Sequence, residues 1–419
     1  MGLHEEMVAM GQKAVIASRG LARLSSRKKT AILLAMADEV EAQRDLIKKA
    51  NTLDMAAAKA AGLADALMDR LALTDSRINH MARSLREVAG LKDPVGAVIS
   101  RWIRPNGLEI VKVRVPIGVI AIIYEARPNV TSDAAGLCFK TSNAVILRGG
   151  KESLQSNGTI VQALQAGGAK AGLPENAIQW VPTTDREAVK ELVQLEGLVD
   201  LAIPRGGEAL IRAVVEQARI PVIKHYKGVC HTYVDQAADL DKALKICENA
   251  KCQRPGVCNA METLLVHEAV ATRFLPLIAQ RLGVELKVEL RGDEASRAIV
   301  PAMKLATEAD WYAEYLDLVL AVKVVPSVKA AIEHINKYGS NHSDAIISEC
   351  EEAQKEFTHD VGSAVVYVNA STRFTDGAEF GMGAEVGIST DKLHCRGPMG
   401  LEELTTYKYI ITGDGQIRE

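Results

Sequence analysis

Hydrophobic residues in roughly the first ninety positions recur at the spacing of α-helices. Ile32, Met36 and Val40 repeat every fourth residue, and the stretch 46–62 is rich in alanine and lysine with few helix breakers. The pattern therefore predicts an α-helical layer at the N-terminus.

The pattern then changes to the two-residue alternation of β-strands. Residues 98–103 and 109–115 alternate in this way on either side of an Asn106-Gly107 turn. We expect a β-hairpin that packs one face on a neighbour, because the second strand places its valines on one face and its basic residues on the other. The valines are Val111, Val113 and Val115, and the basic residues are Lys112 and Arg114.

From residue 117 onward, short apolar segments alternate with helical segments. This order is typical of a parallel sheet that is buried on both faces. A second α/β unit is expected to begin near 231–235 and to end near Val368-Asn369. The predicted strands of the first sheet are 118–124, 144–147, 177–181, 199–203 and 220–223.

Two of these strands end in glycine pairs. Arg148-Gly149-Gly150-Lys151 follows one strand, and Arg205-Gly206-Gly207 follows another. In a doubly wound sheet, such turns bring helix N-termini and their free N–H groups to a phosphate. The chain has no G-x-G-x-x-G motif, and each pair alone fits an ordinary helix-entry turn equally well. Two pairs on consecutive turns of one sheet favour a nucleotide site.

Cys258 follows a Pro-Gly turn between a helix-like and a strand-like segment, within Gln253-Arg-Pro-Gly-Val-Cys-Asn259. Lys251 and Arg254 lie just upstream, and an electropositive setting favours the reactive thiolate. The alternative is a buried structural cysteine, which is the more common use of a free thiol. The residues around Cys258 leave both interpretations open.

Composition narrows the class of protein. The 419 residues, about half of them hydrophobic, are enough for two domains with full cores. A net charge of -3 without a strongly basic face argues against nucleic acid as a partner. Apolar runs are strand-sized, so no membrane span is expected. The seven scattered cysteines match neither zinc-site spacing nor a secreted disulfide framework, so we expect no metal site and a reducing, cytoplasmic location.

Several longer strings resemble a known superfamily. Five segments are similar, in order and spacing, to landmarks of the aldehyde dehydrogenase superfamily. They are Pro116-Ile117-Gly118-Val119, 143–148, 171–174, the Cys258 segment and Val368-Asn369. Further strings match one branch, which reduces the acyl phosphate L-glutamate 5-phosphate. The resemblance covers nearly the whole chain. The strings of that branch are 124–131, 337–346, 369–377, 383–390 and 396–401.

The resemblance implies an aldehyde dehydrogenase-like α/β fold with three parts. Residues 1–230 would form the parallel-sheet cofactor domain and would include an oligomerisation hairpin at 97–115. Residues 231–369 would form the α/β catalytic domain with the nucleophilic cysteine. Residues 370–419 would return along the molecule with a substrate-site loop and an oligomerisation strand at 404–412.

The resemblance also implies roles for the cofactor residues. Arg148 and Lys151 would flank the cofactor ribose, and Glu314 would lie near the nicotinamide ribose. Lys151 stands where NAD-preferring members commonly carry an acid, and a cation there suits a 2′-phosphate, so we expect NADP(H). The two glycine turns described above, independently of the resemblance, would add contacts from Gly149, Arg205, Gly206 and Gly207.

One departure concerns the general base. Hydrolytic members carry Glu-Leu-Gly-Gly, whose glutamate activates water, whereas this chain has Lys224-His225-Tyr226-Lys227-Gly228. An enzyme that exchanges its thioester with phosphate does not need that glutamate. His225 and Lys227 stay open between a direct chemical role and ordinary polar contacts.

The expected reaction is the NADPH-dependent reduction of L-glutamate 5-phosphate to L-glutamate 5-semialdehyde and phosphate through a Cys258 thioester, in L-proline biosynthesis. The Cys258 N–H and the Asn129 side chain are the expected oxyanion donors, although Asn129 also suits a helix cap. Arginine forks bind carboxylate and phosphate, so Arg127, Arg373 and Arg396 are the candidate substrate residues, with surface ion pairs as the alternative.

The expected partners are glutamate 5-kinase, which makes the labile substrate, and further copies of the chain in a homo-oligomer. A second interpretation is another semialdehyde or CoA-acylating dehydrogenase of the same superfamily. A third is a binding protein that keeps the fold without catalysis, against which an intact Cys258 argues.

Overall fold

A computed structural model describes residues 2–418, and these divide into two units. Unit 1 comprises Met1–Lys224, Gly381–Gly387 and Met399–Glu419; unit 2 comprises His225–Phe380 and Ile388–Pro398. The first boundary thus falls at Lys224, where the sequence suggested residue 230. The C-terminal stretch is shared between the units, where the sequence suggested one return segment. No described helix has the length and apolar character needed to span a membrane.

A four-stranded parallel sheet forms the centre of unit 1, in the order β5-β4-β3-β6. Its two central strands are buried on both faces, as the continuous apolar runs predicted. The predicted strand 220–223 forms only a single bridge, between Ala202 and Val222, and Pro221 lacks the N–H that a longer ladder would need. The strands are β3 (Val119–Tyr124), β4 (Ala144–Arg148), β5 (Ile178–Trp180) and β6 (Leu201–Arg205).

Helices account for the N-terminal part of unit 1, which confirms the predicted layer. Ile32, Met36 and Val40 are fully buried. Gly167 lets two helices approach closely, since a Cβ there would lie 2.4 Å from the carbonyl oxygen of Ala35. The helices are α1 (Leu3–Leu21), α2 (Ser26–Ala42), α3 (Arg44–Ala60), α4 (Asp65–Leu71), α5 (Asp75–Gly90), α6 (Asn129–Lys140), α7 (Leu154–Lys170), α8 (Glu187–Val193) and α9 (Glu208–Gln217).

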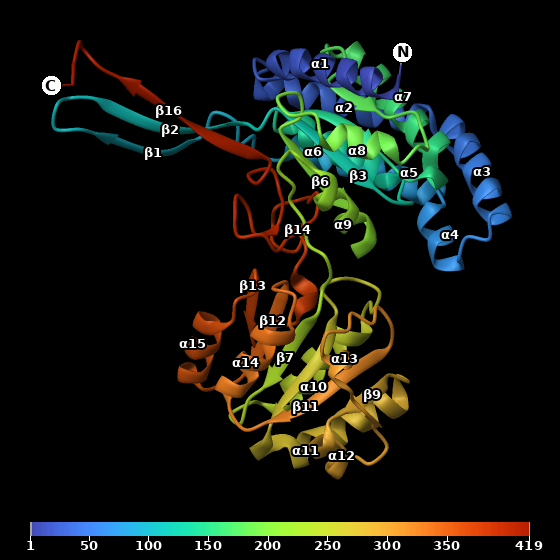
Figure 1. Ribbon diagram of the computed structural model, residues 1–419, viewed down its shortest axis with the longest axis vertical. Helices are drawn as coiled ribbons and strands as arrows, with labels where there is room; N and C mark the ends of the chain where they lie inside the picture. Colours follow the sequence, from blue (N-terminus) through green and yellow to red (C-terminus); the bar gives the residue numbers. More distant parts are fainter. Residues whose placement is uncertain (1, 419) are drawn as a thin grey trace. The chain divides into compact units, whose positions relative to one another are not determined.

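The predicted hairpin is also confirmed. Strands β1 (Val98–Ile103) and β2 (Glu109–Pro116) pair antiparallel, and β16 (Thr405–Thr412) pairs with the other edge of β2. The three strands run together as a long ribbon (Figure 1). Val111 and Val113 are buried on one face, as their alternation predicted.

Unit 2 is built on a seven-stranded parallel sheet in the order β10-β9-β11-β8-β7-β12-β13. The sheet has a hydrophobic core on each face, and consecutive residues of β8 point into the two cores. Leu264 packs in one cluster with Phe274, and Leu265 packs in the other with Phe357. The strands are β7 (Cys230–Val234), β8 (Met261–His267), β9 (Glu289–Gly292), β10 (Lys304–Leu305), β11 (Val319–Val325), β12 (Ser343–Ile347) and β13 (Val365–Val368).

The helices of unit 2 cover both faces of this sheet, as expected for an α/β unit. Figure 1 shows α14 and α15 together on one side of the strands. A short antiparallel pair, β14 (Ile388–Ser389) and β15 (Gly397–Pro398), completes the unit. The helices are α10 (Leu240–Cys252), α11 (Glu268–Ile278), α12 (Glu294–Ile299), α13 (Glu308–Trp311), α14 (Val328–Tyr338) and α15 (Glu351–Asp360).

Candidate active site

Cys258 lies in the loop between the end of α10 and the start of β8, where the sequence placed it. Its side chain is half-buried. The expected positive surroundings are only partly present, because the fully buried Lys251 ammonium lies 2.5 Å from the equally buried Glu262 carboxylate. Burial raises the pKa of Glu262 to about 7, against the pull of Lys251. Of the two upstream cations, only Arg254 is exposed.

The segment 225–230 packs against the Cys258 loop through a glycine. A Cβ on Gly228 would lie 1.8 Å from the Cys258 carbonyl oxygen, so no side chain fits at this position. The Gly228 N–H donates to Glu314 Oε1 at 2.8 Å, and the Val229 N–H donates to Ser340 Oγ at 2.8 Å. These contacts hold the segment that carries His225 beside the cysteine. They also place Glu314 next to this segment; its predicted contact with the cofactor stays a prediction.

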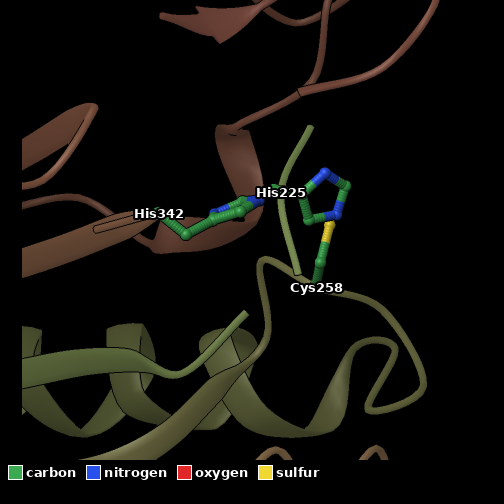
Figure 2. Close-up of side chains that lie close together, drawn as sticks. All are labelled: His225, Cys258 and His342. Atoms are coloured by element: carbon green, nitrogen blue, oxygen red, sulfur yellow. The ribbon is translucent and has the colours of Figure 1, made fainter. Parts of the chain in front are cut away.

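His225 and His342 face the Cys258 sulfur from two different segments (Figure 2). One nitrogen of each ring and the sulfur all lie within 4.8 Å of one another. The His225 Nδ1 lies 2.8 Å from the carbonyl oxygen of Ile388. The rings meet edge to face, with their centroids 5.6 Å apart.

His342 is fully buried in this arrangement, and burial lowers its pKa to about 3, so the ring is neutral near pH 7. Its Nδ1 lies 2.9 Å from Ser343 Oγ, and its buried Nε2 has no hydrogen-bond partner among the described residues. His342 lies in the string 337–346, and the sequence by itself assigned it no role in the chemistry. No local signal links it to Cys258, because the two residues come from separate strand ends of the sheet.

A cavity of about 440 Å³ lies at the carboxyl ends of the unit 1 strands, where the nucleotide site was expected. Arg148 and Lys151 are both in its wall. The Arg148 guanidinium donates to the carbonyls of Gly149, Thr184 and Asp185, and burial lowers the pKa of Arg148. Its Nε is buried without a partner, whereas Lys151 is exposed at the cavity wall.

The second glycine turn already holds a carboxylate. The Gly207 N–H donates to Glu125 Oε2 at 2.9 Å, directly before α9 begins at Glu208. A Cβ on Gly206 would lie 2.7 Å from the same carboxyl group. Arg205 ends the strand before this turn. The turn therefore accepts an anion, although the anion here is a side chain of the protein itself.

The candidate substrate residues divide between the two units. Arg373 lies beside the cysteine loop in unit 2: its Nη1 donates to Asn259 Oδ1, and its Nε donates to Gln253 Oε1 at 3.0 Å. Arg396, also in unit 2, donates to the Gly362 carbonyl. Arg127 is an exposed residue of unit 1.

Asn129 is the first residue of α6 in unit 1. It does not cap that helix; its Nδ2 donates to Asp133 Oδ2 at 3.2 Å, one turn further on. Its expected role as an oxyanion donor stays a prediction.

Comparisons with known proteins agree with this architecture. Residues 2–318 match the family model described as the aldehyde dehydrogenase family. The chain is 58% identical to the γ-glutamyl phosphate reductase of Moorella thermoacetica and 54% identical to that of Geotalea daltonii, each over 419 residues and the whole of both chains. The crystal structure of γ-glutamyl phosphate reductase from Thermotoga maritima superposes with a TM-score of 0.97 at 47% identity, covering 99% of this chain and 100% of that one.

Proposed function

Since the chain belongs to the aldehyde dehydrogenase family, we propose that it reduces L-glutamate 5-phosphate to L-glutamate 5-semialdehyde and phosphate. The proposed reductant is NADPH, and the proposed pathway is L-proline biosynthesis. The observation that carries the proposal is the half-buried Cys258 in a loop beside His225. His225 belongs to the stretch 224–228, which corresponds to the Glu-Leu-Gly-Gly segment of hydrolytic members. The relatives named γ-glutamyl phosphate reductase, identical at more than half of all positions, support the choice of substrate.

In the proposed mechanism, the Cys258 sulfur attacks the acyl carbon of the substrate, the bond from that carbon to the phosphate oxygen breaks, and a thioester forms. The backbone N–H of Cys258 is a candidate donor to the developing oxyanion. NADPH, when bound, supplies the hydride that reduces the thioester. The bond from carbon to sulfur then breaks and releases the aldehyde.

Arg373 is the candidate anchor for the substrate within unit 2. Its guanidinium already binds the side chain of Asn259, the residue after the nucleophile. A guanidinium there suits the α-carboxylate or the phosphate of the substrate. Arg127 and Arg396 remain further candidates for the other anionic group.

The cofactor proposal rests on the cavity of unit 1. The family uses NAD(P), and the buried Arg148 Nε without a partner, together with the exposed Lys151 ammonium, suits an anionic nucleotide. Arg148, Gly149 and Lys151 would hold one end of it, and the turn Arg205-Gly206-Gly207 would hold a phosphate in place of the Glu125 carboxylate. The Lys151 cation favours NADP(H) over NAD(H) because it suits a 2′-phosphate.

We also propose that the three-stranded sheet β1-β2-β16 joins copies of the chain into a homo-oligomer. Several of its large apolar side chains are exposed, among them Ile103 at 71% and Ile411 at 59%. Such a surface favours burial against a partner. A glutamate 5-kinase as the source of the labile acyl phosphate and a cytoplasmic location stay predictions.

The reverse reaction tests the function directly. Reduction of NADP by L-glutamate 5-semialdehyde should require inorganic phosphate and should disappear in Cys258→Ala. The matched control is Cys252→Ala, which removes a thiol from the end of α10 in the same part of the chain and should keep the activity.

Other results would contradict the proposal in different ways. Activity that needs coenzyme A in place of phosphate would support a CoA-acylating dehydrogenase. Activity without either acceptor would indicate hydrolysis of the thioester. Activity that survives in Cys258→Ala would remove the nucleophile from the proposal.

A further inference from the structure

We propose that His225 is the catalytic residue that moves the proton of Cys258: it accepts the thiol proton, passes it to the departing phosphate, and later returns a proton to the sulfur. This inference deepens the proposed function and rests on it for the identity of the substrate. The contact between the thiol and the imidazole does not depend on the substrate and is tested separately below.

The hydrogen bond at Nδ1 decides which nitrogen of His225 is available. The Ile388 carbonyl oxygen, 2.8 Å from Nδ1, can only accept, so Nδ1 carries the hydrogen. In the neutral ring, Nε2 therefore keeps the lone pair and is the basic nitrogen. Figure 2 shows one ring nitrogen of His225 directed at the Cys258 sulfur. The carbonyl thus orients the ring and stabilises the imidazolium that forms when Nε2 takes a proton.

The other polar groups around the cysteine are engaged elsewhere. The Lys227 Nζ donates to the carbonyl of Tyr312 at 2.8 Å, an ordinary polar contact. Glu314 accepts from the Gly228 N–H, and Arg373 donates to Asn259. Within the described segments that touch the cysteine, these contacts leave the two imidazoles as the bases directed at the sulfur.

His342 lies beside His225 but does not take part in the transfer of the Cys258 proton. It is fully buried and neutral, and its ring meets that of His225 edge to face. Burial disfavours a charge on His342, so an imidazolium at His225 has no cationic neighbour on that side. The more accessible His225 is therefore the ring that exchanges its proton with the substrate and the solvent.

The proton accounting follows the two halves of the reaction. In the first half, the Cys258 S–H bond breaks as the bond between sulfur and the acyl carbon forms. His225 transfers that proton to the phosphate oxygen whose bond to carbon breaks, so phosphate leaves as the hydrogen phosphate dianion. In the second half, the hydride from NADPH reduces the thioester, the bond between carbon and sulfur breaks, and its electron pair returns to sulfur. A solvent proton reaches the thiolate through His225, and the net reaction consumes one proton.

His225→Asn is the informative substitution. The asparagine amide retains a donor for the Ile388 carbonyl but has no atom equivalent to Nε2. We expect kcat to fall roughly 10²–10⁴-fold, the range for a lost general acid–base group, with KM for the substrates little changed. Added imidazole should restore part of the rate. Lys227→Gln is the matched control in the same segment, and its kcat should stay within a few-fold of the parent enzyme.

Alkylation of Cys258 by iodoacetamide, without substrate, tests the pair independently of the proposed function. We expect His225→Asn to slow alkylation at neutral pH at least tenfold and Lys227→Gln to leave it unchanged. If the parent enzyme lacks phosphate-dependent activity but His225→Asn slows alkylation, the assigned substrate is wrong. The proposed proton transfer between Cys258 and His225 would still be supported. Unchanged alkylation and a kcat within a few-fold of the parent would overturn the inference.

The parent enzyme provides a second readout in case the variant does not fold. The pH dependence of its alkylation should show thiolate forming below the ordinary thiol pKa of about 8.5. The charged groups near the pair are Arg373, which interacts electrostatically with Cys258 and Arg254, and Glu314, which accepts from the Gly228 N–H. The titratable Cys230 thiol donates to the Cys258 carbonyl. Variants of Arg254, Arg373 and Cys230 should still form the Cys258 thiolate below the ordinary thiol pKa. If the alkylation rate instead followed a single ionisation of Cys258 at the ordinary thiol pKa, the result would contradict the proposal.

Discussion

The backbone of Gly228 packs directly against the backbone of Cys258. A Cβ at Gly228 would lie 1.8 Å from the Cys258 carbonyl oxygen and 2.5 Å from its carbonyl carbon. Gly228→Ala must therefore push apart the segments that carry His225 and the cysteine. We expect a loss of several kcal/mol in the free energy of unfolding, of the order seen for overpacked sites, together with most of the activity.

Gly256→Ala is the control for this prediction. Its nearest non-neighbouring atom, the Leu316 carbonyl oxygen, would lie 3.6 Å from the new Cβ, an ordinary contact. Urea unfolding and kcat measured side by side should separate the two variants. Equal unfolding free energies and equal kcat values for the two variants would mean that the Cys258 loop can move away from residue 228 with little loss of stability.

Lys251 and Glu262 form a fully buried ion pair, and its loss should destabilise unit 2. Removing one partner leaves an uncompensated buried charge, so Lys251→Met should cost about 3–5 kcal/mol. The double variant Lys251→Met/Glu262→Leu should recover much of that loss. Lys355→Met, which breaks an exposed pair with Glu351, should cost less than about 1 kcal/mol. A double variant as unstable as the single one would show that the pair is not the cause.

His334 should make unit 2 sensitive to acid. Burial, with smaller contributions from His231, Lys323 and Lys337, lowers the pKa of His334 to about 2. Below about pH 6.5 the unfolded chain therefore binds a proton at this residue that the folded unit does not bind. The stabilisation is fully present above that pH and decreases by about 1.4 kcal/mol per pH unit as the pH falls towards the folded pKa.

His334→Leu should remove this part of the slope between about pH 6 and pH 4, as measured by urea unfolding. The exposed His359 provides the comparison, because its ring contacts water in both states. If His359→Leu flattened the profile as much as His334→Leu, burial would not be the source of the acid sensitivity.

Lys151 should control the choice of cofactor. It is exposed at the wall of the unit 1 cavity, so Lys151→Ala should raise KM for NADPH about tenfold, which corresponds to about 1.4 kcal/mol, and should change KM for NADH much less. Lys170→Ala, which removes a surface lysine paired with Glu39, should alter neither value. A parallel rise for both cofactors would argue against recognition of a 2′-phosphate.

The sheet β1-β2-β16 should hold copies of the chain together. Ile103→Lys with Ile411→Lys places two charges on exposed apolar positions of this sheet and should shift the protein to monomers in light scattering. Ile417→Lys, exposed at 84% beyond the end of β16, should leave the assembly intact. An unchanged mass for the double variant would place the interface elsewhere.

Local pattern was enough to predict much of this protein. Hydrophobic periodicity predicted the N-terminal helices, the parallel strands and the hairpin, because the period of apolar residues directly reflects the geometry of a helix or a strand. It failed at 220–223, where Pro221 limits the pairing. The Cys258 loop and both glycine turns could also be located from the sequence, since a loop after a Pro-Gly turn and a helix-entry turn are each formed by consecutive residues.

The tertiary structure alone decided which groups meet. It brought His342 to Cys258, paired Lys251 with Glu262 and placed the Glu125 carboxylate at the Gly207 N–H. It also turned the Arg148 guanidinium onto three backbone carbonyls. Most of these contacts join residues from separate elements: Lys251 lies in α10 and Glu262 in β8, whereas Glu125 and Gly207 follow the neighbouring strands β3 and β6. The order of strands in the sheets and the packing of the helices determine these contacts. Neither can be inferred from the spacing of residue types along the chain.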